Sequence, residues 1–160
     1  MSTRKGFSKR LFDENDQRAK DAARDLVVSL GIHALVENPK KQGVDLIGLD
    51  KKGNEVLYLE VEVKRVWKAG EDFPYPDVNL PQRKSRYLDA KKFSKPVIFA
   101  IFNEDLSKVA LFGRDAVAKA KLEEVPNRFI SEGEMFYKIP LDKVRFVDIG
   151  GPYVKNVLRG

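Results

Sequence analysis

Two neighbouring segments of this chain show the residue alternation of β-strands. One covers residues 43–48 (GVDLIG), and the other covers residues 58–64 (YLEVEVK). Because successive side chains on a strand point to opposite faces, Val61 and Val63 are expected to enter a core, while Glu62 and Lys64 point together to the other side. The residues between them, 50–54 (DKKGN), are typical of a hairpin turn. The pattern predicts paired strands over 44–49 and 56–66.

The predicted hairpin carries two acids and a lysine that can converge. Asp45 begins the first strand, and Glu62 and Lys64 lie two residues apart on the second. Two carboxylates beside an ammonium form a site for a divalent cation and an activated water, which is the minimal equipment for metal-assisted phosphodiester hydrolysis. The other interpretation is a salt bridge on an exposed strand face.

The residue types that are rare in the chain exclude several other kinds of site. There is no cysteine, which excludes disulfides, thiolate zinc sites and cysteine nucleophiles, and a reducing, cytoplasmic compartment is expected. The single histidine, His33, is too few for a zinc hydrolase with two or more nitrogen ligands. No nucleophile-elbow pattern accompanies it. We expect His33 to be an ordinary residue at a junction between a helix and a strand.

Length and charge indicate a single domain with a polyanionic partner. The 160 residues fit one domain, and no apolar run approaches the roughly 20 residues of a membrane span. The formal net charge is +6. A basic surface suits nucleic acid, although charge alone is no motif. Residues 1–12 are expected to form a flexible basic arm.

The expected elements alternate between helices and strands. A helix over 13–30 would be capped by Asp13 and ended by Gly31, and a second helix over 81–93 would be capped by Asn79. Further elements are expected as strands over 32–37, 96–102, 109–112, 136–139 and 144–149, and a helix over 114–122. The natural solution is an α/β fold with a mixed central β-sheet flanked by helices.

The motif and its context resemble the PD-(D/E)xK nuclease superfamily, whose fold is called restriction-endonuclease-like. The family's two acids map onto Asp45 and Glu62, and its lysine maps onto Lys64, while Val44 stands in place of the proline. The matching core would span residues 13–102, and residues 103–160 would complete the sheet.

The resemblance implies a Mg²⁺-dependent mechanism, with Mn²⁺ as a substitute. Asp45, Glu62 and the Val63 carbonyl would hold the metal, and Lys64 would orient or deprotonate the attacking water. Family members often add an acid from the first helix, for which Glu14 is preferred here. The alternatives are Asp16, Asp21, Asp25 and, at the end of the first strand, Glu37.

Two further features of the site follow from neighbouring segments. Glu60 shares a strand face with Glu62, and pairing with a basic residue of a flanking helix is favoured over a role as a third ligand. Gln82 and Arg83 occupy the place where related nucleases often carry a glutamine or a basic residue that faces the phosphate. The expected nucleic-acid contacts are Lys40, Lys41, Arg65, Lys68, Arg83, Lys84 and Arg86. The aromatic residues Trp67, Phe73 and Tyr75 are expected in a core or an interface rather than stacked on bases.

The combined interpretation is a Mg²⁺-dependent DNA endonuclease that acts as a homodimer, since one site cuts one strand. A Holliday junction resolvase, a repair nuclease or an RNA-directed nuclease with the same site is the alternative. From another class, a catalytically silent nucleic-acid-binding module stays open.

Overall fold

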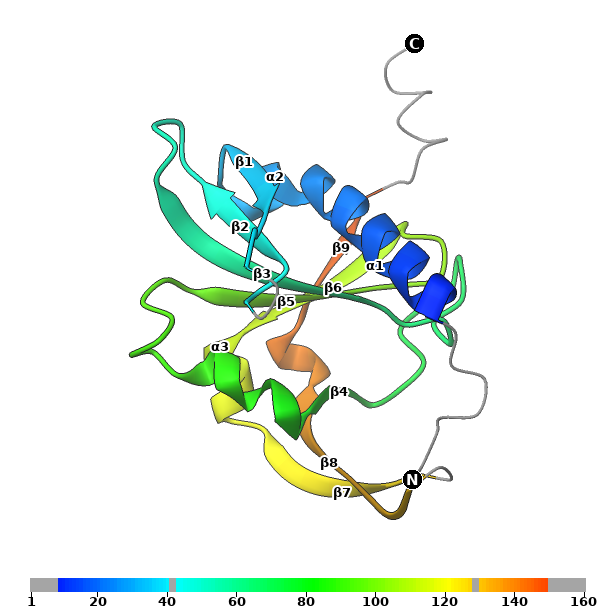
Figure 1. The fold of residues 1–160 in the computed structure, drawn as a ribbon. Helices are drawn as coiled ribbons and strands as arrows, with labels where there is room; N and C mark the ends of the chain where they lie inside the picture. Colours follow the sequence, from blue (N-terminus) through cyan, green and yellow to red (C-terminus); the bar gives the residue numbers. More distant parts are fainter. Residues whose placement is uncertain (1–8, 41–42, 128–129, 150–160) are drawn as a thin grey trace.

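The computed structural model describes residues 9–40, 43–127 and 130–149 of the chain (Figure 1). Its helical elements are α1 Lys9–Ala23, η1 Arg24–Leu26, α2 Val27–Leu30, η2 Gln82–Leu88, α3 Arg114–Ala118 and η3 Leu141–Lys143, where η marks a 3-10 helix. Its strands are β1 Ala34–Glu37, β2 Leu46–Leu49, β3 Glu55–Val63, β4 Asp77–Pro81, β5 Val97–Phe102, β6 Lys108–Gly113, β7 Lys121–Asn127, β8 Ile130–Pro140 and β9 Arg145–Asp148. Within these ranges, every helix is too short or too polar to cross a membrane.

The strands form two sheets. The larger has six strands in the order β1-β2-β3-β5-β6-β9, and the smaller has three in the order β4-β8-β7. In the larger sheet β3 and β5 run parallel, while its other neighbours are antiparallel. In Figure 1, α1 lies over one face of this sheet, and the small sheet lies on the other side with α3. The predicted α/β fold with a mixed central sheet flanked by helices is confirmed.

The alternation of β3 builds a core on each face of the large sheet. Its residues Leu57, Leu59 and Val61 pack on the side of α1, where Ala19 and Ala23 let the helix come close. The opposite face packs against β4, β8, η2 and α3, with Phe99 and Ile101 from β5. As predicted, Val61 and Val63 both join the core on the α1 side.

The first helix starts earlier than expected and is interrupted. It begins at Lys9, so Asp13 lies inside α1 and cannot cap its start. Residues 9–12 of the expected flexible arm are therefore helical, and residues 1–8 lie outside the described residues. The end is as predicted: Gly31 has φ of 68°, the left-handed conformation that glycine adopts without strain, and its N–H reaches back to the last turn.

The second predicted helix is wrong in type and length. It is the 3-10 helix η2, which spans seven residues rather than thirteen. Asn79 cannot cap it because Asn79 lies within β4, opposite Lys138 of β8. The segment before η2 contains a strand that was not predicted, β4, which is an edge strand of the small sheet. Pro81 is accommodated there because an edge strand can omit one donor.

The late strands also divide differently from the prediction. Strand β9 joins the edge of the large sheet beside β6, but β8 pairs with β4 and β7 in the small sheet. Strand β7 begins at Lys121, where a helix was expected to continue. The helix α3 stops at Ala118.

Candidate active site

A pocket of about 330 Å³ opens where α1, the end of β3 and η2 meet. The segment before β2 contributes Asp45 to it. Its lining residues are Asp16, Ala19, Asp45, Val61, Glu62, Val63, Arg83 and Lys84. The pocket thus collects three carboxylates and two cationic side chains from four separate parts of the chain.

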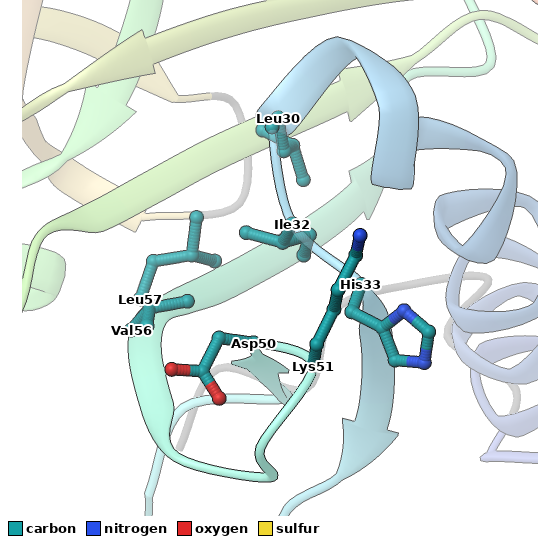
Figure 2. A pocket seen from close by; sticks show the side chains of 8 residues that line it. Leu30, Ile32, His33, Asp50, Lys51, Val56 and Leu57 are labelled. Carbon is teal, nitrogen blue, oxygen red and sulfur yellow. The ribbon is translucent and has the colours of Figure 1, made fainter.

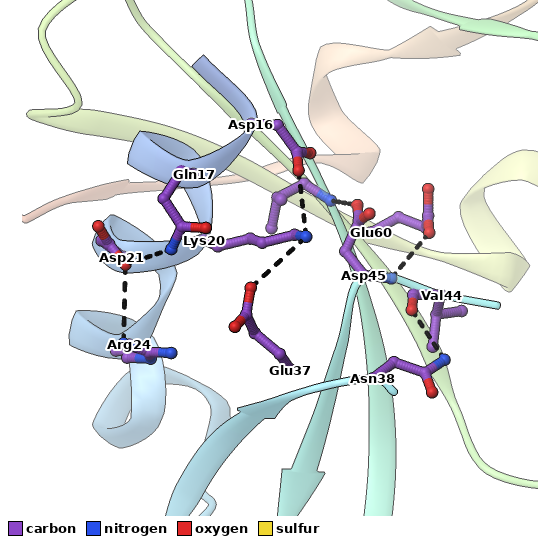
Figure 3. Close-up of polar contacts among 11 residues, drawn as sticks. Asp16, Gln17, Lys20, Asp21, Arg24, Glu37, Asn38, Val44, Asp45 and Glu60 are labelled. Carbon is purple, nitrogen blue, oxygen red and sulfur yellow. Dashed lines mark hydrogen bonds and ion pairs between the residues drawn. The ribbon is translucent and has the colours of Figure 1, made fainter. Parts of the chain in front are cut away.

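Asp45 and Glu60 are linked across the hairpin in both directions. The register places Leu46 opposite Leu59, so Asp45 lies beside Glu60. The Asp45 amide donates to Glu60 Oε1 at 3.1 Å, and the Val61 amide donates to Asp45 Oδ2 at 2.9 Å (Figure 3). Each side chain therefore satisfies a backbone donor of the other strand, which fixes the positions of both carboxylates.

Glu60 also forms an ion pair with a residue of η2. The Lys84 ammonium lies 2.8 Å from Glu60 Oε2, and the Glu60 side chain is only 6% exposed. The prediction that Glu60 pairs with a basic residue of a flanking helix is confirmed. Burial by itself would lower the pKa of Lys84, but the attraction and hydrogen bond of Glu60 outweigh it and raise that pKa. Lys84 is therefore a cation at neutral pH.

The Asp45 carboxyl resists ionisation. Burial is the largest cause, and the neighbouring charge of Glu60 adds to it, so that the pKa of Asp45 rises from 3.8 to about 6. The hydrogen bond from Val61 acts in the opposite direction but does not cancel these effects. A nearby cation would stabilise the charged form of a carboxylate in such a position. Shifts of pKa of this kind are frequent at functional sites.

The three residues that end β3 and follow it have different surroundings. Glu62 is exposed and lines the pocket, and Val63 ends the strand beside it. Lys64 is not among the lining residues. Its backbone N–H continues the pairing to Phe102, but its ammonium lies over the ring of Tyr75, 5.4 Å from the centroid. The structure thus brings Asp45 and Glu62 to one pocket and directs Lys64 elsewhere.

The helix acid in the pocket is Asp16. Its Oδ2 lies 3.1 Å from the Lys20 ammonium, which is also 3.6 Å from Glu37 Oε1 (Figure 3). Glu14, the preferred residue from the sequence, is exposed on the same helix and does not line the pocket. The sequence held a usable signal, because Asp16 lies three residues before Ala19 and therefore shares the buried face of the helix.

The other predicted binding residues divide into two groups. Arg83 lines the pocket and lies 3.4 Å from Glu134, while Gln82 is exposed at the start of η2. The rest do not line the pocket or lie outside the described residues. Lys40 and Arg65 are exposed, Lys68 pairs with Glu104 at 3.3 Å, Arg86 stacks on Tyr87 at 4.8 Å, and Lys41 is outside the described residues.

The aromatic residues after β3 form a cluster with β9. Trp67 is buried, and its ring meets Phe73 edge-on at 5.2 Å and Phe146 at 5.9 Å. The Trp67 indole N–H donates to the Glu71 carbonyl. The preference for a core role is confirmed for Trp67, while Tyr75 stays largely exposed.

A second pocket, of about 420 Å³, lies at the hairpin end of β2 and β3 (Figure 2). Its lining includes Leu30, Ile32 and His33, and His33 lies between α2 and β1, as expected. The acid there, Asp50, uses its carboxylate to accept the amides of Lys52 and Asn54, which closes the turn. This pocket therefore lacks the converging carboxylates of the first.

The metal expected from the sequence can be tested against these donors. Across residues 9–40, 43–127 and 130–149, no three His, Asp or Glu side chains are grouped closely enough to hold an ion on their own. Mg²⁺, however, is usually bound by one or two carboxylates with substrate phosphates and waters. The oxygen donors Asp45, Glu62 and the Val63 carbonyl fit such a partial ligand set in type and number.

Similarity to known proteins is found among solved structures and not among family models or curated proteins. No protein-family model matches the chain, and none of the curated proteins matches it. Among solved structures, it is similar to Hjc, a Holliday junction resolvase from the archaeal hyperthermophile Archaeoglobus fulgidus, at 14% sequence identity and a TM-score of 0.41. The match covers 88% of each chain.

Proposed function

We propose that this protein is a metal-dependent nuclease that hydrolyses phosphodiester bonds in DNA. The observation that carries the proposal is the pocket in which Asp45, Glu62, Arg83 and Lys84 meet. Carboxylates beside cationic side chains suit a reaction in which a metal ion and an anionic phosphate must be bound together. The excess of basic residues in the chain, with a net charge of +6, favours the same polyanionic substrate.

The metal would be held by Asp45, Glu62 and the Val63 carbonyl. When bound, a Mg²⁺ ion polarises a phosphoryl oxygen and lowers the pKa of its bound water. The raised pKa of Asp45 supports this assignment, because the ion would offset the burial and the Glu60 charge that oppose ionisation of Asp45. Glu60 is a positioning residue in this scheme, since its two oxygens already accept the Asp45 amide and the Lys84 ammonium.

The cationic side chains of η2 would bind the substrate backbone. Arg83 and Lys84 line the pocket, and Gln82 lies next to them in the chain. Backbone contacts of this kind position a duplex without reading its sequence. Cutting both strands would need a second site, for which a homodimer is the economical arrangement.

Cleavage assays test the proposal directly. Supercoiled plasmid, linear duplex, single strand, RNA and a four-way junction would be incubated with Mg²⁺ or Mn²⁺. We expect metal-dependent cutting of DNA that falls by about 100-fold or more in Asp45→Asn and in Glu62→Gln. Glu55→Gln is the matched control, because Glu55 is an exposed acid at the opposite end of the same strand.

The panel also separates the alternatives. Preference for the four-way junction would make the enzyme a resolvase, and cutting of RNA alone would replace DNA as the substrate. No cutting of any substrate would contradict the nuclease. Calorimetry with Mn²⁺ then identifies a silent nucleic-acid-binding module. A nuclease should bind the ion in the wild type and lose this binding in Asp45→Asn, whereas a silent module should show no such site.

A further inference from the structure

We propose that Lys84, rather than Lys64, supplies the ammonium that faces the substrate phosphate in this pocket. The inference rests on the proposed nuclease function and names the cationic group of the same site. The role of the lysine thereby passes from the end of β3 to the 3-10 helix η2, which a long connection separates from β3.

The position of Lys64 argues against it. Although Lys64 follows Glu62 at the spacing of the sequence motif, β3 ends at Val63 and the pocket lining ends there too. The Lys64 ammonium lies 5.4 Å from the centroid of the Tyr75 ring, in a cation–π contact. In this contact the charge of Lys64 lies against the aromatic segment after β3.

Lys84 is held where a phosphate-binding group is needed. Its ammonium is fixed at 2.8 Å from Glu60, whose other oxygen accepts the Asp45 amide at 3.1 Å. Glu60 thus sets the position of the ammonium relative to Asp45 through two short contacts. The Lys84 side chain keeps 24% of its surface exposed, and it lines the pocket beside Glu62.

The chemistry of the ammonium fits binding of an anion. A lysine ammonium has three N–H donors, and the contact with Glu60 uses one of them, which leaves donors for phosphate oxygens. Glu60 favours the charged form, so Lys84 acts as an electrostatic and hydrogen-bonding group rather than as a base. This pairing also explains why an acid on the face of Glu62 is buried at all.

Single-turnover cleavage of the best substrate by matched variants tests the inference. We expect Lys84→Met to lose about 100-fold in rate, Lys84→Arg to recover part of it through the retained charge, and Lys64→Met to lose far less. Lys52→Met, at the exposed hairpin turn, is the control for loss of a surface lysine. A large loss in Lys64→Met with near-normal cleavage in Lys84→Met would overturn the inference.

Two measurements keep the test decisive. Lys84→Met leaves Glu60 buried without its partner, and the double variant Lys84→Met/Glu60→Gln removes this unpaired charge. Thermal unfolding of each variant shows that the protein tested is folded. Duplex binding in EDTA, followed by fluorescence anisotropy, does not depend on cleavage. There Lys84→Met should weaken binding by about fivefold or more relative to Lys64→Met.

The two proposals fail in different ways. If the wild-type protein cuts nothing, the nuclease function fails, and the binding comparison alone decides about Lys84. Equal binding by Lys84→Met and the wild-type protein would overturn the role of Lys84 whether or not the protein is a nuclease.

Discussion

The Asp45 amide donates to the Glu60 carboxylate at 3.1 Å, while the carboxylate of Asp45 accepts the amide of the residue after Glu60 at 2.9 Å. Two acids on paired strands are therefore held close together by the backbone, despite their like charges. Burial, and then the neighbouring charge of Glu60, raise the pKa of Asp45 to about 6. A site of this kind lowers the stability of the folded protein until a cation binds there.

Replacing Asp45 with asparagine is expected to stabilise the protein above pH 6. The folded-state pKa of Asp45, about 6, lies above the ordinary value of 3.8, so its protonated form favours folding. That stability is fully present below about pH 4 and is lost as the pH rises through 6. Asparagine cannot ionise, and its side-chain oxygen can still accept the Val61 amide.

Urea unfolding of the wild type and of Asp45→Asn across this pH range measures the effect. The variant should gain up to about 2 kcal/mol near pH 8 and nothing near pH 3, where Asp45 is protonated in both the folded and the unfolded protein. An equal difference at both pH values would contradict the assigned ionisation.

The ion pair between Lys84 and Glu60 should contribute far more to stability than one at the surface. Lys84→Met leaves the Glu60 charge buried and unpaired, with an expected loss of about 2 to 3 kcal/mol. The matched variant Lys68→Met breaks the pair with Glu104, whose two side chains are 56% and 44% exposed, and should lose under about 0.5 kcal/mol. Chemical denaturation at neutral pH compares the two, and similar losses would argue that solvent reaches Glu60.

Asp16 is predicted to contribute to cleavage more than the other acids of α1. It lines the pocket, and its charge also contributes to the raised pKa of Asp45. We expect Asp16→Asn to reduce the cleavage rate by about 10-fold or more, since it removes a carboxylate beside the proposed ion. Asp21→Asn is the matched variant, because Asp21 is exposed on the same helix, where it bonds to Gln17. Equal rates for the two variants would remove Asp16 from the site.

Gly48 in β2 is expected to tolerate no side chain. A Cβ there would lie 2.7 Å from Leu57 Cδ1 and 3.0 Å from Ile32 Cδ1, both in the packed layer between the sheet and the helices. Gly48→Ala should therefore destabilise the fold by about 1 to 3 kcal/mol. Gly113→Ala is the control, since its nearest neighbour would be a carbonyl oxygen at 3.8 Å. Thermal unfolding of both variants checks the difference.

Local patterns predicted the parts of the fold and site that depend on local geometry. The period of two in residues 55–63 predicted the hairpin and the inward valines, because register and alternation follow from neighbouring residues. Strand β4 was missed because Pro76 just before it and Pro81 at its end indicate a loop, and only its place at the edge of the small sheet makes Pro81 acceptable.

Contacts between distant segments were not available from such patterns. Lys84 meets Glu60 across 24 residues, and nothing in the spacing of the motif distinguishes its ammonium from that of Lys64. The preference for Glu14 over Asp16 was different in kind. That Asp16 shares a helix face with Ala19 follows from helical geometry alone, so its place beside the pocket could be expected from the sequence.

The parallel pairing of β3 with β5 has a consequence for how the protein folds. The hairpin of β2 and β3 closes over a short turn, so Asp45 and Glu60 can meet early. Pairing β3 with β5 requires the long crossover from residue 64 to residue 96, which also contains η2 and Lys84. Contacts of such sequence separation form slowly. During refolding the acids are therefore expected to come together before their lysine, and a competent pocket should appear only after the hairpin.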